Sequence, residues 1–459
     1  MTEYKEYIKS SIPWISKIPS HWKVIRGKNL YKKMQRPVYS NDEVVTCFRD
    51  GTVTLRKNRR TTGFTESLKE IGYQGIRKGD LVIHVMDAFA GAIGVSDSDG
   101  KGTPVYSVCQ AKGNSNNQYY AHLLRIMAQK GFIQSLYRGI RERSSDFRFE
   151  VFASQFYPVP PRAEQDQIVR FLDWKVSCIN KLIKIKKKQI NLLIEQEKRI
   201  ISDSVLLGLK GTKLKDTGNR WISKIPLNWE LIKLGKFCSF QNGISESGDF
   251  FTSGTPFVGY SDVYRHLELP IEIKGVAKSD KQQQEIFSVK KGDIFFTRTS
   301  ENIEEIGMAA VCKQTIEKAV FSGFIIRCRP RIQLINIDFI KYYLQIPAIR
   351  NHFSSMMNIV IRASLSQYLL KQMPVVIPPI EEQKEIAIYL NEQHLKYISL
   401  KETIQKQIET LKALKTRLIS DVVTGKIDVR DIEIPDYEFV AEEQTESSTE
   451  TEQTEEQED

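Results

Sequence analysis

The sequence predicts an α+β protein in which two similar globular modules are joined by two long helices that form an antiparallel coiled coil. The chain has 459 residues, about three times the length of a typical domain, and 41% of them are hydrophobic, so it can bury more than one core. Several short sequences recur in the same order in its two halves. Each half closes on an apolar pattern of the heptad type. Together these observations predict an internal pseudo-twofold repeat.

The repeat begins with a tryptophan-containing motif. Residues 14–19 read Trp-Ile-Ser-Lys-Ile-Pro and are followed by Trp22, and residues 221–226 repeat the same six residues and are followed by Trp229. Six identical residues that include a tryptophan make chance similarity a poor explanation, and self-similarity of this kind indicates duplicated structural units.

Three further motifs recur along the two halves. They are Lys78-Gly79-Asp80 with Lys291-Gly292-Asp293, Pro160-Pro161 and Gln165 with Pro378-Pro379 and Gln383, and Ile201-Ser202-Asp203 with Ile419-Ser420-Asp421. The offset between copies grows along the first part of each half and is constant from the Pro-Pro step to Ile-Ser-Asp. Segments of variable length therefore alternate with segments of fixed length, which predicts two divergent modules and two rigid rods.

The two modules are expected at residues 1–158 and 211–376. Short β-branched and aromatic runs follow a Gly-Asp turn in each, at residues 81–83 and 294–296, and predict strands. Helical patterns around residues 119–127 and 339–344 interrupt them. Modules of about 150 residues with mixed helices and strands are of ordinary domain size.

The long helices are expected at residues 159–210 and 377–430. Acidic and amide residues follow each Pro-Pro step, as suits the positive end of a helix dipole. The heptad core positions are Leu172, Val176, Ile179, Ile183, Lys186, Ile190, Leu193, Glu197 and Ile200, then Leu390, His394, Tyr397, Lys401, Ile404, Ile408, Leu411, Lys415 and Leu418. A rod of about 65 Å results from ~44 residues at 1.5 Å each. Such a rod needs a partner, so the two are expected to pair antiparallel with one module at each end.

Charge divides the chain into a basic body and an acidic tail. The whole chain carries a formal net charge of +11, and residues 431–459 hold 13 acidic side chains and no Lys or Arg, so the first 430 residues carry +24. A body this basic indicates a polyanionic partner, most often nucleic acid; a basic enzyme with a small anionic substrate is the alternative. The tail is expected to be disordered, either simply solvated or screening the body from nonspecific DNA.

Other composition features favour a soluble, cytoplasmic protein. No apolar run approaches the ~18 residues that cross a bilayer, and the first ten residues lack the apolar segment of a secretory signal. The six cysteines include no CxxC pair, so neither a zinc ribbon nor a disulfide framework is expected.

No catalytic or metal-binding motif is found. The histidines form no HxH or HExxH arrangement, and residues 94–102 resemble a phosphate-binding loop with one residue too many and with Gly102 where a Ser or Thr should bind magnesium. The Pro-Pro steps lack the Asn or Asp partner of an amino-methylating motif, and no nuclease triplet is evident. A non-catalytic chain is therefore expected, and an enzyme with an unrecognised site is the alternative.

Polar loops provide the candidate DNA contacts. Arg can bond guanine bidentately and Asn or Gln can bond adenine, although most single surface cations contact phosphates. The candidates are Arg56, Lys57, Asn58, Arg59, Arg60, Arg141, Arg143, Gln241, Asn242, Arg298, Ser300, Asn302 and Arg362.

Taken in order and repeated twice, these motifs make the chain similar, over nearly its full length, to the specificity (S) subunits of type I restriction–modification systems. The motifs are Trp-Ile-Ser-Lys-Ile-Pro-x-x-Trp, Lys-Gly-Asp, Pro-Pro-x-x-x-Gln and Ile-Ser-Asp. Each is modest alone, and their order makes the resemblance specific.

The resemblance implies a DNA-recognition subunit without catalytic residues. Residues 1–158 and 211–376 would be target-recognition domains, each reading one half of a bipartite asymmetric site in double-stranded DNA. The helices would set the spacer and dock two methyltransferase (M) subunits, and restriction/translocase (R) subunits would complete the complex. S-adenosylmethionine, ATP and Mg²⁺ would belong to those partners and not to this chain. The alternative function is a non-enzymatic coiled-coil scaffold.

Overall fold

The computed structural model describes residues 2–59, 71–136, 146–246, 248–300, 306–356 and 363–442. The chain divides into two compact units, one made of residues 1–188 and 405–459 and the other of residues 189–404. Each unit contains one globular module and parts of both long helices. Within the described residues no helix is both long and apolar enough to span a bilayer.

Unit 1 begins with a module of short strands and helices. Its elements are β1 (Tyr7–Lys9), β2 (Lys17–Pro19), β3 (Lys23–Arg26), α1 (Gly27–Leu30), β4 (Tyr31–Lys33), β5 (Val45–Cys47), β6 (Val53–Leu55), η1 (Arg56–Asn58), β7 (Gln74–Ile76), β8 (Leu81–His84), η2 (Ala88–Ala90), β9 (Ile93–Val95), β10 (Gly100–Gly102), β11 (Tyr106–Ala111), α2 (Asn117–Gln129), α3 (Phe132–Ser135), α4 (Phe149–Ser154) and β12 (Phe156–Val159), followed by α5 (Arg162–Leu207).

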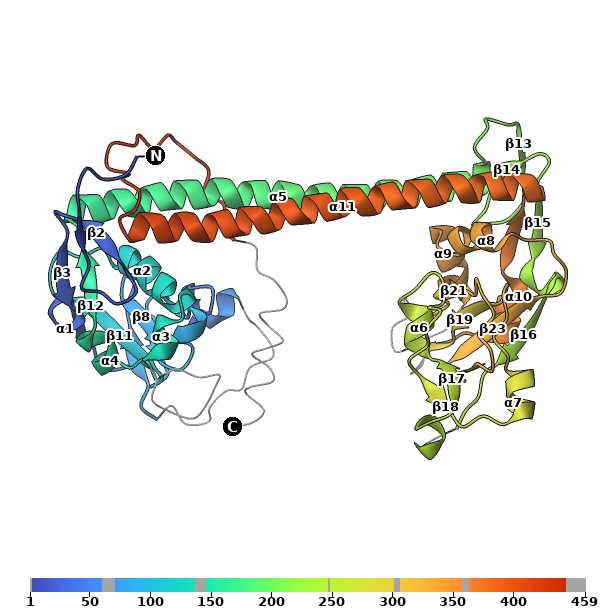
Figure 1. The fold of residues 1–459 in the computed structure, drawn as a ribbon, viewed down its shortest axis with the longest axis horizontal. Helices are drawn as coiled ribbons and strands as arrows, with labels where there is room; N and C mark the ends of the chain where they lie inside the picture. The colour runs from blue at the N-terminus through green and yellow to red at the C-terminus, as the bar shows by residue number, and fades with distance from the viewer. Residues whose placement is uncertain are drawn as a thin grey trace. The chain divides into compact units, whose positions relative to one another are not determined.

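A four-stranded antiparallel sheet in the order β4-β11-β8-β9 forms the centre of this module. Pairs β1-β2, β3-β12, β5-β6 and β7-β10 surround it. Helix α2 packs against β8 and β9 (Figure 1). Leu81, Val82 and Ile83 are fully buried in β8, which confirms the strand predicted after Gly79-Asp80. Burial of both faces explains why this strand reads as a continuous apolar run.

Unit 2 carries the second module. Its elements are β13 (Leu214–Asp216), β14 (Lys224–Pro226), β15 (Glu230–Lys233), η3 (Leu234–Lys236), β16 (Cys238–Asn242), η4 (Gly248–Phe251), β17 (Thr255–Val258), α6 (Tyr260–Tyr264), β18 (Val276–Ala277), α7 (Lys281–Ile286), β19 (Ile294–Thr297), β20 (Thr299–Ser300), β21 (Ala309–Val311), β22 (Val320–Phe321), β23 (Ile325–Pro330), α8 (Ile337–Tyr343), α9 (Pro347–Met356), β24 (Ala363–Ser364), α10 (Gln367–Gln372) and β25 (Pro374–Ile377), followed by α11 (Ile380–Val423).

The central sheet of this module has the order β16-β23-β19-β21 and is antiparallel throughout. Helices α6 and α8 pack against it through β21 (Figure 1). Pairs β13-β14, β15-β25 and β20-β24 and a three-stranded sheet β18-β17-β22 complete the module. The predicted strand at residues 294–296 is β19, and all three residues are fully buried.

The Pro-Pro-x-x-x-Gln motif anchors α5 to the first module. Gln165 Nε2 donates to the Pro160 carbonyl at 2.9 Å, and Gln165 Oε1 accepts the Asn116 backbone N–H at 2.8 Å. Asn116 in turn caps α2. In the same first turn, Glu164 accepts the Trp22 indole N–H at 2.9 Å. The glutamine therefore fixes the start of the long helix to the start of α2.

The second module uses the same contacts at the start of α11. Gln383 Nε2 donates to the Pro378 carbonyl at 2.8 Å, and its Oε1 accepts the N–H of Asn336, which caps α8, at 2.7 Å. Glu382 accepts the Trp229 indole N–H at 2.9 Å. The repeated tryptophan and glutamine therefore have one structural role in both halves.

Each tryptophan also contacts a glycine beyond the end of a long helix. Gly208 follows α5 with a φ of +76°, and a Cβ there would lie 3.2 Å from the Trp229 ring. Gly425 follows α11 with a φ of +75°, and a Cβ there would lie 2.9 Å from the Trp22 ring. Both positions need glycine because the left-handed backbone and the close approach each disfavour a side chain.

Burial along the long helices follows the predicted heptads. Every predicted core position from Leu172 to Ile200 and from Leu390 to Leu418 is buried or partly buried. In unit 2, Glu197 accepts bonds from His394 at 2.7 Å and from Lys401 at 2.8 Å. In unit 1, Lys415 donates to Asn180 at 3.5 Å. The polar core residue Glu197 thus pairs with polar core residues of the other helix, whereas Lys415 pairs with Asn180, which lies beside the predicted core position Ile179.

Two boundaries differ from those predicted. Val159 belongs to β12, and the first helix spans Arg162–Leu207, because two consecutive prolines separate strand from helix. Disorder was predicted from residue 431, and this is wrong for residues 431–442. Their backbone carbonyls accept hydrogen bonds from side chains of α5, for example from Gln167 to the Ile432 carbonyl at 2.7 Å. Composition alone could not reveal this, because the contacts use mainly backbone atoms.

Candidate nucleic-acid interface

The first group of predicted DNA contacts forms the short helix η1 and lies against its own module. Arg56 Nε donates to Thr46 Oγ1 at 3.3 Å, Asn58 Nδ2 donates to Thr54 Oγ1 at 2.8 Å, and Lys57 pairs with Glu43 at 2.8 Å. Lys57 and Asn58 are exposed. The group is therefore preorganised on the β5-β6 pair, with exposed polar tips available to DNA.

Arg59 is held differently. Its guanidinium lies 4.1 Å from the centre of the Phe48 ring and 2.9 Å from Asp50, and its side chain is only 13% exposed. Burial opposes the charge on Asp50, but bonds from the Thr52 N–H and from Arg59 lower the pKa of this carboxyl below its usual value. An arginine already paired in this way is poorly placed to read a base edge, so its predicted role as a base reader is not favoured.

The structure leaves several predicted contacts undescribed. Arg60, Arg141, Arg143, Asn302 and Arg362 lie outside the described residues. The backbone of Ser300 is described in β20, where it pairs with Ala363, but its side chain is not.

The second module gathers its candidates at one end of the central sheet. Asn242, at the end of β16, accepts a bond from Gln367 Nε2 at 3.0 Å. Arg298, just beyond β19, donates from Nη1 to the Gly323 carbonyl at 3.3 Å, and the N–H of Gly323 bonds the Ile244 carbonyl at 2.7 Å. The turn at Gly323 therefore bonds both to Arg298 and to the segment that follows Asn242. The sequence did not single out Phe324, which is 63% exposed beside them, because a lone aromatic after a glycine carries no distinctive pattern.

Strand register shows what occupies these positions in the first module. Cys109 pairs with Leu81 and Lys33, as Cys328 pairs with Ile294 and Phe240. Counting from these pairs, Gln241, Asn242 and Arg298 take the places held in the first module by Met34, Gln35 and Val85. The two modules therefore present different side chains at matching sheet positions.

A buried Asp–Arg pair lies at the base of each sheet. Asp80 pairs with Arg36, with one N–O distance of 3.1 Å, and also accepts the Arg77 N–H at 2.8 Å. Asp293, fully buried, is bonded by Arg329 at 2.6 and 2.7 Å and by the Lys290 N–H at 2.7 Å. These pairs give the Lys-Gly-Asp motif a structural role that sequence reasoning missed, namely neutralising a buried carboxylate.

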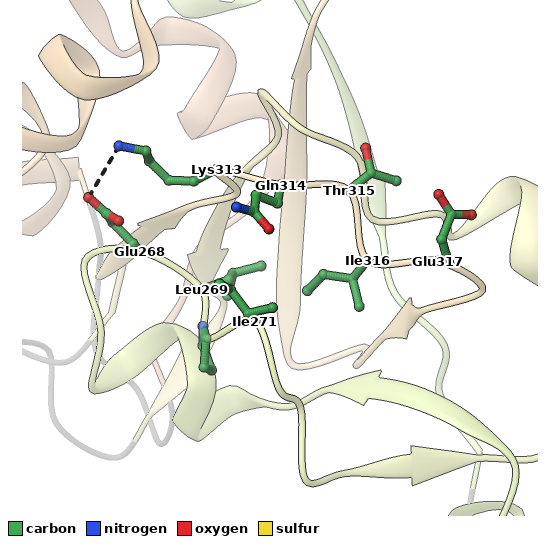
Figure 2. Close-up of a pocket in the computed structure, with 9 residues that line it drawn as sticks. Glu268, Leu269, Ile271, Lys313, Gln314, Thr315, Ile316 and Glu317 are labelled. Atoms are coloured by element: carbon green, nitrogen blue, oxygen red, sulfur yellow. Dashed lines mark ion pairs between the residues drawn. The ribbon is translucent and has the colours of Figure 1, made fainter.

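Other polar features of unit 2 are less suited to DNA. A pocket of about 350 Å³ lies between residues 268–271 and 313–317, and Figure 2 shows the ion pair of Lys313 with Glu268 (3.8 Å) on one side of it and Glu317 on the other. Mixed charges of this kind give no net attraction for a polyanion. Among the described residues, no cluster of three or more His, Cys, Asp or Glu is arranged to hold a metal ion.

Comparison with known proteins agrees with the resemblance found in the repeated motifs. The model of the type I restriction modification DNA specificity domain matches residues 226–410. The chain is similar to specificity subunits of type I restriction–modification systems, and this similarity supports the resemblance predicted from the motifs.

Two specificity subunits illustrate the similarity. The MjaVIII specificity subunit of Methanocaldococcus jannaschii is 22% identical over 427 residues, which cover 91% of this chain and 95% of that protein. The EcoKI specificity subunit of Escherichia coli K12 is 24% identical over 271 residues, covering 58% of this chain and 55% of that protein.

Solved structures support the α+β fold of this chain. A chain from a study of assembly and conformational transition in the type I R-M system superposes with a TM-score of 0.66 at 17% identity, covering 89% of this chain and 99% of that chain. The HsdS subunit of Thermoanaerobacter tengcongensis gives a TM-score of 0.51 at 15% identity, with 89% and 98% covered.

Proposed function

We propose that the chain directs a type I restriction–modification complex to a bipartite, asymmetric site in double-stranded DNA. Residues 1–158 read one half-site and residues 211–376 read the other. The observation that carries this proposal is the pair of modules with one buried frame and different side chains at the sheet end, where Gln241, Asn242 and Arg298 replace Met34, Gln35 and Val85.

The long helices act as the spacer and as the docking surface for two methyltransferase subunits. We infer that they form an antiparallel coiled coil that relates the halves as a pseudo-twofold repeat. Buried heptad positions on both helices support this, as do the bonds of Glu197 with His394 and Lys401 in unit 2 and of Asn180 with Lys415 in unit 1. Each pair joins a later residue of one helix to an earlier residue of the other.

Chemistry is assigned to the partners. S-adenosylmethionine is expected on the methyltransferase subunits, and ATP and Mg²⁺ are expected on the restriction/translocase subunits. The role of this chain is to position those subunits on DNA through contacts with bases and phosphates.

Methylation mapping tests the recognition role. The chain is co-expressed with its methyltransferase partner, and modified adenines are located by sequencing. The expected result is one split motif with a fixed spacer, in which exchange of residues 1–158 for another module changes one half only. Methylation without a motif, or a change in both halves, would contradict the proposal.

The spacer role has its own test. Insertion of one heptad into each long helix, after Lys188 and after Ile404, lengthens the pair by about 10 Å, or about 3 base pairs of B-DNA. The methylated site should then have a spacer about 3 base pairs longer. An insertion into α5 alone is the control, because it breaks the pairing and should abolish methylation. An unchanged spacer after both insertions would show that the helices do not set it.

The alternative function is a coiled-coil scaffold that assembles partners without reading DNA. Under that alternative, replacing Asn242 and Arg298 by Ala leaves the methylation pattern produced by the complex unchanged. Loss of site-selective methylation with intact complex assembly would eliminate the scaffold function.

A further inference from the structure

Unit 1 contains a basic cavity that the predicted recognition loops do not include. Its volume is about 400 Å³, and it lies where α2, η1, α5 and the last turns of α11 meet. Among the described residues, the cations that line it are Arg59, Arg125, Lys184, Lys187, Lys412 and Lys415, and the carboxylates are Asp50 and Glu442. Asp50 is already committed to Arg59 at 2.9 Å, so the cavity keeps a large excess of positive charge.

Two of the cations are held in conditions that favour an anion. Arg125 lies on α2 with its Nε buried and, in the part of the chain that the structure describes, without a hydrogen-bond partner. Burial also lowers the pKa of this guanidinium, and Glu442 is one of the carboxylates that oppose the shift. The side chain of Lys415 is only 10% exposed. Buried cations of this kind are stabilised by an anion that enters the cavity.

The anion present is a carboxylate from the C-terminal segment. Glu442 pairs with Lys415 at 2.6 Å and is 58% exposed. We call residues 429–442 the C-terminal strap. It is held along α5 through its backbone: Ser177 Oγ donates to the Glu438 carbonyl at 2.9 Å, and Asn180 Nδ2 donates to the Val440 carbonyl at 3.0 Å. These bonds do not depend on the acidic side chains, so the strap delivers Glu442 to the cavity as an exchangeable ligand.

We propose that this cavity binds phosphate groups of the DNA backbone, and that Glu442 and the acidic residues after it compete with DNA for the same cations. The carboxylate of Glu442 stands where a phosphodiester oxygen would bind. Arg125 supplies the planar fork that suits phosphate, and the exposed Lys184 and Lys412 supply mobile point charges for neighbouring phosphates. Eight more acidic residues and no cation follow Glu442 in the sequence, so the competitor is strongly anionic.

This inference rests on the proposed function in that DNA is taken as the ligand of the chain, but it requires no sequence reading. It predicts that the acidic tail weakens binding of the chain to a DNA duplex of any sequence, most strongly at low salt. The practical consequence is that the tail disfavours nonspecific DNA, for which phosphate contacts are nearly the whole interaction.

The test measures binding of the full-length chain to a 30-base-pair duplex of random sequence by fluorescence anisotropy. In the tail variant, the acidic residues from Glu442 to Asp459 are replaced by Gln or Asn, which keeps the length. Its Kd should be lower by about tenfold at 50 mM salt, with a smaller difference at 200 mM, because competition among exposed charges is screened. Equal Kd values for the variant and the parent chain would overturn the inference.

Two matched comparisons locate the effect. E442Q should lower the Kd for the duplex, whereas E438Q, which removes an equal charge from the same strap but pairs with Lys181 at 3.5 Å outside the cavity, should change it little. The pair K184S/K412S, both exposed, should weaken binding several-fold in the tail variant and much less in the parent chain, where the tail competes for these lysines. An equal effect in both backgrounds would show that the tail acts by general repulsion and not at this cavity.

Failure of this inference and failure of the proposed function are separable. If the tail variant binds random duplex more tightly, K184S/K412S weakens binding mainly in that variant, and yet no split motif is ever methylated, the cavity is a phosphate site and the recognition function is wrong. If a split motif is methylated and the tail variant binds like the parent, the recognition function stands and the competition does not exist.

Discussion

The two modules share a buried frame and differ at the end of the sheet. In both, the strand after the Gly-Asp turn is central and fully buried, and a glutamine joins the long helix to a capped helix of the module. At the sheet end, Arg298 takes the place of Val85 and Asn242 takes that of Gln35. Burial restrains the frame in both copies, whereas the less buried positions at the sheet end can vary with a smaller loss of stability. The difference therefore indicates where each module carries its own recognition chemistry.

A second difference between the modules concerns the glutamate in the first turn of each long helix. Glu164 accepts bonds from Tyr4 at 2.6 Å, His21 at 2.8 Å and Trp22 at 2.9 Å. For its counterpart Glu382, the described residues provide the indole of Trp229 at 2.9 Å. The N-terminal segment thus strengthens the start of α5 through contacts that the described residues do not repeat at the start of α11. Similar motifs therefore do not imply equal contributions to stability.

The largest effect is expected from the buried Asp–Arg pair. Asp293→Ala leaves Arg329 without its carboxylate and should lower the free energy of unfolding by about 3–5 kcal/mol, measured as the first transition in urea. Asp293→Asn should cost less, because the amide oxygen still accepts the Lys290 N–H. A loss no larger than that of the exposed Asp249→Ala would show that the pair has no structural role.

The unequal glutamates provide the next comparison. Glu164→Gln disturbs three hydrogen bonds of a buried carboxylate and should cost about 2 kcal/mol, whereas Glu382→Gln disturbs one and should cost about 1 kcal/mol or less. The urea midpoints of the two variants, compared at an equal dependence of the unfolding free energy on urea concentration, test this difference. Equal losses would mean that the N-terminal segment adds nothing to the start of α5.

The next effect concerns recognition of bases by the second module. Arg298→Ala should weaken binding of the methylated duplex site by about 10- to 100-fold, or 1–3 kcal/mol, and should relax specificity in one half-site only. The control is Arg331→Ala, whose guanidinium bonds the backbone carbonyls of Gly235 and Lys236. If both variants lose affinity equally on every sequence, Arg298 contacts phosphate and not a base.

The smallest effect concerns acid sensitivity. Burial lowers the pKa of His122 to about 4, and its Nε2 has no hydrogen-bond partner within the described residues. His122 is therefore protonated near pH 6.5 in the unfolded chain but only near pH 4 in the folded chain. The free energy of unfolding consequently decreases as the pH falls from about 6.5 toward 4. His122→Gln should reduce the loss between pH 7 and pH 5.5 by about 1 kcal/mol.

His352 provides the matched variant in the second module. Burial lowers its pKa as well, so His352→Gln should act in the same direction. Urea unfolding at pH 7 and pH 5.5 tests both variants, and a pH dependence unchanged in His122→Gln would contradict the assignment.

The sequence by itself determined the duplication, the strands at residues 81–83 and 294–296, the two long helices with their heptad positions, and the similarity to specificity subunits. These features depend on short-range pattern and on burial, which leave a periodic record in residue type. It also predicted Asn242 and Arg298 as DNA contacts, as members of a larger set of polar loop residues, and this stays a prediction.

Only the tertiary structure decided which of those residues are available. It showed Arg59 held by Asp50 and Phe48. It also gave the Lys-Gly-Asp motif an arginine partner, Arg36 from the segment after β4 in the first module and Arg329 from β23 in the second. It also placed Glu442 of the strap against Lys415. Such contacts join residues far apart in the chain through single hydrogen bonds and backbone atoms, which have no period and no characteristic residue type for a sequence to reveal.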